Sequence, residues 1–255
     1  MFGKVRTAFQ REWLRADGEL AVSMQTAYLL ALAFDLLPEN ARARAAERLV
    51  DDIRSRNCHL STGFVGISHL NPILTLTGHT EVAYQLLLQE SYPSWLFPVK
   101  QSATTIWERW DSWTLADGFN KDGMNSFNHY SLGSVGEWLF RHVAGIELDP
   151  DVPGYERFVL KPYLGAGLEW AGADYKTAHG TIRSHWRRDG DQVHWEITVP
   201  PNTRARVYVP SEPGTEVSSD GLELTERDGR FAVGQAVAGR YTFTRTWREL
   251  VSHSP

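Results

Sequence analysis

The sequence has a single cysteine, Cys58, among its 255 residues. One cysteine cannot form an intramolecular disulfide, and without companions at metal-ligand spacing it excludes a cysteine-based zinc site. The sequence also lacks any run of about 18 apolar residues, and its first residues contain no apolar stretch of signal-peptide length. These absences predict a soluble chain stabilised by packing, with no metal, no other cofactor and no membrane contact. As written the chain is expected in the cytoplasm, but an N-terminal part that precedes it would leave the compartment open.

A surplus of basic charge is missing as well. The formal net charge is -5 and the basic residues are scattered rather than gathered into a stripe, so a nucleic-acid partner is not expected. What the sequence does contain is aromatic residues, with 10 tryptophans, 9 tyrosines and 11 phenylalanines. Flat aromatic rings stack on the apolar faces of pyranose sugars, so this composition is compatible with a sugar-binding cleft.

The first 90 or so residues follow a helical rhythm. Segments 22–39 and 65–78 are apolar on most sides and are predicted to be buried helices, the first of them ending at Pro38. Segments 39–56 and 80–89 carry charged faces and are predicted to be outer helices, the second with Thr80 as its N-cap. The apolar stripe of segment 39–56 consists of Ala45, Leu49, Val50 and Ile53. Buried and outer helices that alternate across short loops predict antiparallel pairs, as in an α/α toroid.

The rest of the sequence changes character twice. Residues 91–130 lose the helical period, and one further helix is predicted over 131–145, beginning at a serine and ending at a glycine. Beyond it, Val, Ile, Thr and Trp recur at every second position in short runs that predict an antiparallel β-sandwich. The predicted fold is therefore α+β, with a partial toroid of antiparallel helix pairs over residues 1–148 and a sandwich over residues 149–255.

A candidate catalytic residue lies in the sequence "ATTIWERWD", residues 103–111, where Glu108 stands between Trp107 and Trp110. Hydrolysis of a glycosidic bond needs two carboxyl groups, one that protonates the leaving oxygen and one that acts as nucleophile or activates water. Neighbouring indole rings would partly desolvate the Glu108 carboxylate, as suits a general base. The alternative is that Glu108 forms an ion pair with Arg109 or another arginine on a loop surface.

The segment around Glu108 resembles the corresponding segment of a known family. "ATTIWERWDSW", preceded by "YPSWLF" and followed by "MNSFNHYSLGSVGEWLFRHVAGI", strongly resembles the C-terminal half of the bacterial α-L-rhamnosidases of glycoside hydrolase family 78. "TGFVGISHLNPIL" and "AHGTIRSHWRR" extend the resemblance over nearly the whole chain. It implies a six-hairpin (α/α)6 barrel and hydrolysis of terminal α-L-rhamnosides with inversion. It also implies that Glu108 is the general base and that His129 hydrogen-bonds a rhamnose hydroxyl.

Further residues of this region are candidates for the sugar pocket or for structure. His129 has the alternative role of capping the helix predicted to begin at Ser131. Trp95 is expected in the core, and Asp111 and Asp117 are expected in turns. The remaining substrate-binding candidates, each with a purely structural role as the alternative, are Trp107, Trp110, Trp113 and Asn128.

The chain departs from the family in one major respect. The acidic and arginine-rich segment that supplies the family's general acid, of the type D-x-x-x-R-x-E-R-x-x-W, has no counterpart here. Only about half the helices of a closed toroid are predicted, so the inward helix faces require a partner, either a missing N-terminal half or a second copy of the chain. A smaller departure is Ser102, where the family commonly has glycine.

Two functions remain open from the sequence. In the first, the chain is the part of an inverting rhamnosidase that contains the general base, Glu108, and lacks the general acid. In the second, it is a non-catalytic remnant that binds rhamnose or has a purely structural role. Another (α/α)6 enzyme is less compatible with the residues. A polysaccharide lyase needs a catalytic Tyr or Lys arrangement and a glycoside phosphorylase needs a basic phosphate pocket, and neither stands out.

Overall fold

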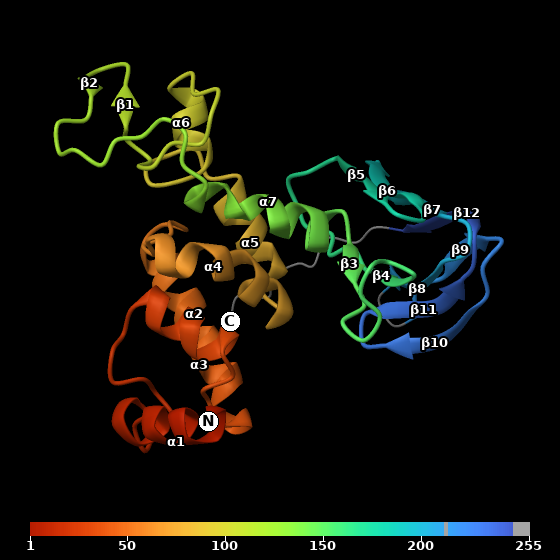
Figure 1. Ribbon diagram of the computed structural model, residues 1–255, viewed down its shortest axis with the longest axis horizontal. Helices are drawn as coiled ribbons and strands as arrows, with labels where there is room; N and C mark the ends of the chain where they lie inside the picture. The colour runs from red at the N-terminus through yellow and green to blue at the C-terminus, as the bar shows by residue number, and fades with distance from the viewer. Residues whose placement is uncertain (212–213, 247–255) are drawn as a thin grey trace. The chain divides into compact units, whose positions relative to one another are not determined.

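The computed structural model describes residues 1–211 and 214–246 (Figure 1). The chain divides into two compact units, Met1–Gly136 and Glu137–Pro255, which are described separately below. The first unit is mainly helical and the second is mainly β-sheet. The domain boundary at 148/149 stays a prediction.

The helical unit contains α1 (Phe2–Trp13), α2 (Gln25–Ala33), α3 (Glu39–Ser55), α4 (Phe64–Leu76), α5 (Thr80–Leu87) and α6 (Leu96–Lys100). Helix α2 packs against α3 and α4, and α4 packs against α5. Within the described residues no helix is long and apolar enough to cross a membrane.

The four helices predicted over residues 22–89 are present, with shifted ends. All four residues of the apolar stripe predicted for α3 are buried, so its outer-helix pattern is confirmed. Helix α2 ends at Ala33 and not at Pro38, because Asp35 has a left-handed backbone with φ of +51°. Pro38 instead precedes α3 as its N-cap. The predicted N-cap of α5 is wrong: Thr80 is the first helical residue, and His79 caps the helix without a side-chain hydrogen bond.

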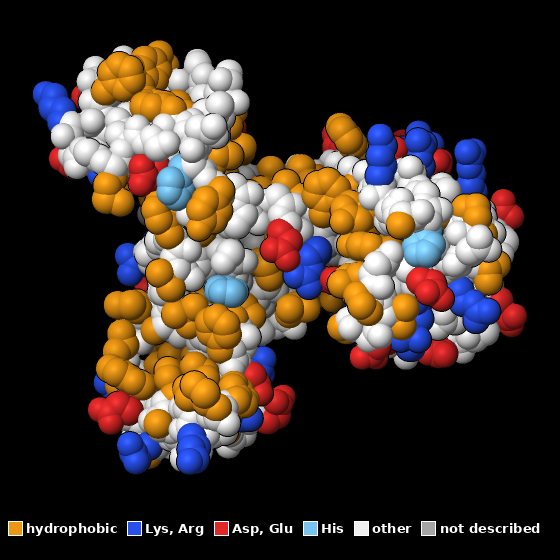
Figure 2. Space-filling view, in the orientation of Figure 1, with side chains coloured by type: hydrophobic (Ala, Val, Ile, Leu, Met, Phe, Trp, Pro, Cys, Tyr) orange, Lys and Arg blue, Asp and Glu red, His pale blue; other side chains and the backbone are white. Residues whose placement is uncertain are grey.

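Helix α1 was not identified in the sequence, and none of its residues is buried. It is attached to the loop before α3 by hydrogen bonds from Arg6 Nη2 to the carbonyl oxygen of Leu37 (2.9 Å) and from Gln10 Nε2 to that of Leu36 (2.8 Å). Hydrophobic side chains gather on the face shown in Figure 2, over the part of the unit that carries α1 and α2. The exposed large apolar residues of α1 to α4 include Phe2, Val5, Trp13, Met24, Phe34, Val65 and Leu76.

The predicted loop region 91–130 is not wholly irregular, because it contains the five-residue helix α6 and a small hairpin of β1 (Trp113–Thr114) and β2 (Gly118–Phe119). The predicted helix 131–145 forms as three consecutive helical segments: the 3₁₀ turn η1 (Ser131–Ser134), α7 (Val135–Trp138) and the π-helical η2 (Leu139–Val143). Gly145 then stops the helix as predicted. Its φ is +79°, and a Cβ there would lie 2.3 Å from the backbone nitrogen of Pro162, so only glycine fits.

The second unit is a sandwich of two five-stranded sheets, with strand orders β10-β11-β8-β4-β3 and β5-β6-β7-β12-β9. Nearly all neighbouring strands are antiparallel, as predicted, but β4 runs parallel to β8. The strands are β3 (Ile146–Leu148), β4 (Arg157–Leu160), β5 (Trp170–Thr177), β6 (Gly180–Asp189), β7 (Gln192–Val199), β8 (Arg204–Pro210), β9 (Val217–Asp220), β10 (Leu224–Asp228), β11 (Phe231–Ala236) and β12 (Gly239–Thr246).

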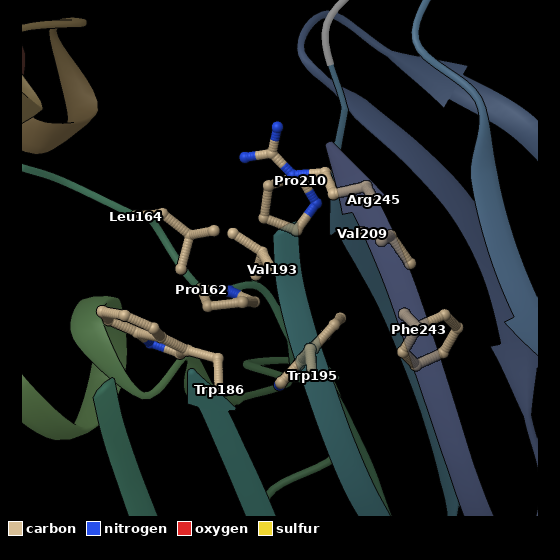
Figure 3. A pocket seen from close by; sticks show the side chains of 9 residues that line it. All are labelled: Pro162, Leu164, Trp186, Val193, Trp195, Val209, Pro210, Phe243 and Arg245. Carbon is tan, nitrogen blue, oxygen red and sulfur yellow. The ribbon is translucent and has the colours of Figure 1, made fainter. Parts of the chain in front are cut away.

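Alternate residues of the long strands are buried between the two sheets, which confirms the predicted period of two. Trp186, Trp195 and Phe243 from one sheet and Val209 from the other line a mostly apolar pocket inside the sandwich (Figure 3). The pocket is completed by Pro162, Leu164, Val193, Pro210 and Arg245. Most of these side chains are buried, so this pocket belongs to the core of the second unit, and none of them is a predicted site residue.

Candidate functional site

The two chain segments that carry Glu108 and His129 are hydrogen-bonded to each other within the helical unit. The backbone N–H of His129 donates to the carbonyl oxygen of Ile106 (2.9 Å), and that of Glu108 donates to the carbonyl oxygen of Ser126 (2.8 Å). The hydroxyl of Thr105 donates to the carbonyl oxygen of Phe127. This pairing brings the two predicted residues together, although 20 positions separate them in the sequence.

The Glu108 side chain is only 13% exposed, and its two oxygens have different surroundings. Oε2 accepts a hydrogen bond from the backbone N–H of Ser126 (3.0 Å). Oε1 lies 4.0 Å from Nε2 of His129, which is 25% exposed. One carboxylate oxygen is therefore held by the backbone, and the other faces the imidazole.

The imidazole of His129 has an aromatic neighbour from a distant part of the unit. The Phe64 ring, at the first residue of α4, stacks on it with 4.8 Å between ring centroids and 16° between ring planes. The Tyr130 ring also lies nearly parallel to it, at 5.4 Å and 11°. On the ring edge, Nδ1 accepts a hydrogen bond from the backbone N–H of Ser131 (3.3 Å), which is the contact expected of the alternative capping role.

Arg109, the residue considered as a partner for Glu108, is engaged elsewhere. Its Nε lies 3.3 Å from Oδ1 of Asp111, and its Nη2 lies 3.6 Å from Oδ2 of Asp122. Among the residues that the structure describes, the ionic contact of Glu108 is with His129. The arginine beside Glu108 in the sequence therefore neutralises loop aspartates, and the Glu108 carboxylate faces the imidazole instead.

The other two loop carboxylates have structural contacts. Oδ2 of Asp111 accepts a hydrogen bond from Nδ2 of Asn120 (3.0 Å). Oδ2 of Asp117 accepts one from the hydroxyl of Thr114 (3.1 Å), whose oxygen in turn accepts the Asp117 backbone N–H (2.9 Å). Both aspartates hold turns of the loop, in line with their expected positions.

The predicted tryptophans differ in their surroundings. Trp107 is buried and packs edge-to-face against Phe127, with the two ring centroids 5.2 Å apart. Trp110 is half-buried and makes an edge-to-face contact of 5.6 Å with Trp95. Trp95 is buried, and its indole N–H donates to the carbonyl oxygen of Leu132 (2.8 Å), so its expected place in the core is confirmed.

Two further predicted residues make their contacts within the loop of residues 109–128. Trp113 is half-buried in β1, opposite Phe119 of β2. Asn128 is exposed, and its backbone N–H donates a hydrogen bond to the hydroxyl oxygen of Ser126. Two residues that sequence reasoning missed are Phe64 and Ser126. The backbone N–H of Ser126 and the ring of Phe64 are brought in by tertiary folding, and no spacing in the sequence signals either contact.

Ser102, just before residues 103–111, has a left-handed backbone with φ of +69°. Glycine adopts this conformation without the steric cost that a side chain brings. This conformation explains why glycine would suit the position, as expected from the family that the sequence resembles. Within residues 1–211 and 214–246, no group of three or more His, Cys, Asp and Glu side chains could hold a metal ion.

The helical unit with this site, followed by the sandwich, defines a class of protein. Residues 1–143 match the bacterial alpha-L-rhamnosidase 6 hairpin glycosidase domain, and residues 145–222 match the bacterial alpha-L-rhamnosidase C-terminal domain. The architecture is therefore a six-hairpin glycosidase domain followed by a C-terminal domain. The chain belongs to the bacterial α-L-rhamnosidase family.

Several relatives cover most of the chain. An alpha-L-rhamnosidase of Streptomyces avermitilis is 41% identical over 245 residues, which is 96% of this chain and 24% of the relative. One of Formosa agariphila is 38% identical over 88% of this chain and 24% of the relative. The crystal structure of Streptomyces avermitilis alpha-L-rhamnosidase complexed with L-rhamnose matches 95% of this chain and 23% of that one, with a TM-score of 0.88 and 40% identity. A structure of the native enzyme from Aspergillus terreus matches 92% of this chain and 26% of that one, with a TM-score of 0.79 and 35% identity.

The chain spans about a quarter of the length of the curated relatives that it matches. The matched quarter contains the segment with Glu108 and His129 together with the C-terminal domain.

Proposed function

We propose that this chain supplies the water-activating half of an inverting glycoside hydrolase that acts on terminal α-L-rhamnosides. Glu108 is the general base and His129 binds a hydroxyl of the sugar. The observation that carries the proposal is their placement: the two side chains face each other at 4.0 Å on paired segments, in a chain of the rhamnosidase family. Trp107, Trp110, Trp113 and Asn128 contribute to the walls of the sugar pocket.

The surroundings of the carboxylate suit a general base. The backbone N–H of Ser126 holds Oε2, so Oε1 is the oxygen that takes the proton from water. Inversion requires a second carboxyl group about 6.5–9.5 Å away, to leave room for that water. Asp111 and Asp117 are both committed to turns, so we assign the general acid to the upstream part of the protein.

The test is hydrolysis of 4-nitrophenyl α-L-rhamnoside by this chain, alone and joined to the upstream part of the same protein. Alone, the chain should be slower by about 10²–10⁴-fold, the usual contribution of a general acid. In the joined protein, Glu108→Gln should lower kcat by a similar factor. NMR of the first sugar released should show β-L-rhamnose, the inverted anomer.

The matched control is Asp117→Asn, which makes the same carboxylate-to-amide change in the same loop. It should leave kcat within about twofold of wild type, because the hydrogen bonds of Asp117 among the described residues lie within its own turn. Undiminished turnover of Glu108→Gln in the joined protein would refute the proposal. A joined protein that binds rhamnose but never hydrolyses the glycoside would favour the non-catalytic alternative.

A further inference from the structure

The two ring nitrogens of His129 can be told apart by their partners. Nδ1 accepts a hydrogen bond from the backbone N–H of Ser131, at 3.3 Å. A backbone N–H can only donate, so Nδ1 carries no proton and the neutral ring carries its proton on Nε2. Nε2 is the nitrogen that lies 4.0 Å from Oε1 of Glu108. The imidazole therefore directs a donor toward the carboxylate oxygen assigned as the proton acceptor.

The separation of 4.0 Å is too long for a direct hydrogen bond and suits one bridging oxygen atom. An oxygen about 2.8 Å from each atom accepts from Nε2–H and donates to Oε1. A water molecule or a sugar hydroxyl can do both. This arrangement works only while the plane of the imidazole is held, because rotation of the ring moves Nε2–H away from the bridge.

The imidazole has two nearly parallel aromatic neighbours, Tyr130 at 5.4 Å and 11° and, from helix α4, Phe64. Its ring lies at 4.8 Å and 16° from the imidazole and is 40% exposed, so it covers the imidazole without being locked in the core itself. Phe64 begins α4, whose start is fixed by its neighbours. The hydroxyls of Thr26 and Thr62 are 2.7 Å apart, and the backbone N–H of Ser61 donates to Gln25 Oε1 (2.7 Å).

We propose that Phe64 is a positioning residue for this site, which orients the His129 imidazole so that Nε2–H faces Glu108. The proposal rests on the proposed function of Glu108 and His129 and adds a residue from a different helix to it. Phe64 acts through His129 and does not itself touch the reacting atoms.

The first test needs no turnover and uses the 255-residue chain. Long-range ¹H–¹⁵N NMR spectra of the histidine side chains report which ring nitrogen carries the proton. Wild type and Phe64→Tyr should show His129 in the Nε2–H form. Phe64→Leu and Phe64→Met, which keep apolar volume but lose the flat face, should shift His129 toward a mixture of the two forms. Unchanged His129 signals in both variants would overturn the proposal.

The matched control is Phe34→Leu. Phe34 is also an exposed phenylalanine in contact with a histidine, but its edge-on partner is His69, at 5.4 Å and 71°. This variant should leave the His129 signals unchanged, and circular dichroism should show equal helix content in all variants. Because this readout requires no hydrolysis, it can succeed or fail independently of the proposed activity.

The second test is a double-mutant cycle in the protein joined to its upstream part. Phe64→Leu should lower kcat/KM by about tenfold, whereas Phe64→Tyr, which keeps a flat ring, should leave kcat/KM within about twofold of wild type. In a His129→Ala background, Phe64→Leu should have no further effect, because residues that act through one another are not additive. Independent, additive losses would show that Phe64 contributes in some other way and would contradict its positioning role.

Discussion

At the scale of single residues, a strained serine, Ser102, directly precedes residues 103–111. Ser102 is exposed and has φ of +69°, a conformation that costs an L-residue about 1–2 kcal/mol. The sequence alone pointed to this position, since glycine is common there in resembling sequences, but it did not show the conformation. Backbone angles depend on how the turn after α6 closes, which no local pattern specifies.

Replacement of this serine should therefore stabilise the helical unit. We expect Ser102→Gly to raise the free energy of unfolding by about 0.5–1 kcal/mol, after the larger backbone entropy of unfolded glycine is subtracted. Ser102→Ala retains a Cβ and should stay within about 0.5 kcal/mol of wild type. Urea unfolding followed by circular dichroism measures both, and a loss of stability in Ser102→Gly would contradict the strain argument.

At the scale of elements, η2 is tied to the sandwich by buried contacts. The carbonyl oxygen of His142 accepts the backbone N–H of Tyr163 (2.8 Å), and that of Val143 accepts the indole N–H of Trp186 (2.8 Å). His142 is buried, and burial lowers its pKa from 6.5 to about 4. Protonation of this imidazole therefore opposes the docking of η2.

The sign of the pH effect follows from the lowered pKa of His142. As the pH falls, His142 is protonated in the unfolded chain before it is protonated in the folded chain. The free energy of unfolding therefore does not depend on this group above about pH 6.5 and decreases between pH 6.5 and pH 4. Between pH 7 and pH 5, the free energy of unfolding should fall by about 2 kcal/mol through this group. Urea unfolding followed by tryptophan fluorescence at both pH values measures the change.

The matched variants are His142→Gln, which should lose this pH-dependent part, and His179→Gln, which should keep it. His179 belongs to the same unit but is only half-buried. An equal pH dependence in wild type and His142→Gln would disprove the assignment to His142.

Elements differ in how far the sequence determines them. Helix α3 was predictable because its buried stripe and charged face repeat with the helical period. Helix α1 was missed because none of its residues is buried and its attachment runs through Arg6 and Gln10 to backbone carbonyls. The parallel pairing of β4 with β8 was missed because alternation of buried residues is the same in both strand directions. Glu108 and His129 followed from a motif, whereas Phe64 is joined to them only by tertiary folding.

At the scale of the whole molecule, the helical unit exposes apolar side chains that a complete barrel would cover. Val65 and Leu76 of α4 are 67% and 63% exposed, and α1 and the residues that flank α2, Met24 and Phe34, contribute others. We propose that the upstream part of the protein, one of the two partners expected from the sequence, buries part of this surface. Burial of apolar area then stabilises the joined protein by about 25 cal/mol per Å².

This proposal predicts a difference between the chain alone and the chain joined to its upstream part. The fluorescence of a hydrophobic dye per mole of protein should be lower in the joined protein, and the thermal midpoint of the helical unit should be higher. As the control, light scattering measures the oligomeric state of the isolated chain. A stable dimer that binds as little dye as the joined protein would favour a second copy of the chain as the partner. Equal dye binding by two monomeric proteins would contradict both partners.

The pairing of residues 105–108 with 126–129 has a consequence for how the family diversifies. The segment between them, with the β1–β2 hairpin, is a loop closed at its base by the Glu108 and His129 backbone hydrogen bonds. Insertions or deletions near its tip leave the two side chains in register. We therefore expect the length and composition of this loop to differ between relatives without any change in the distance between Glu108 and His129.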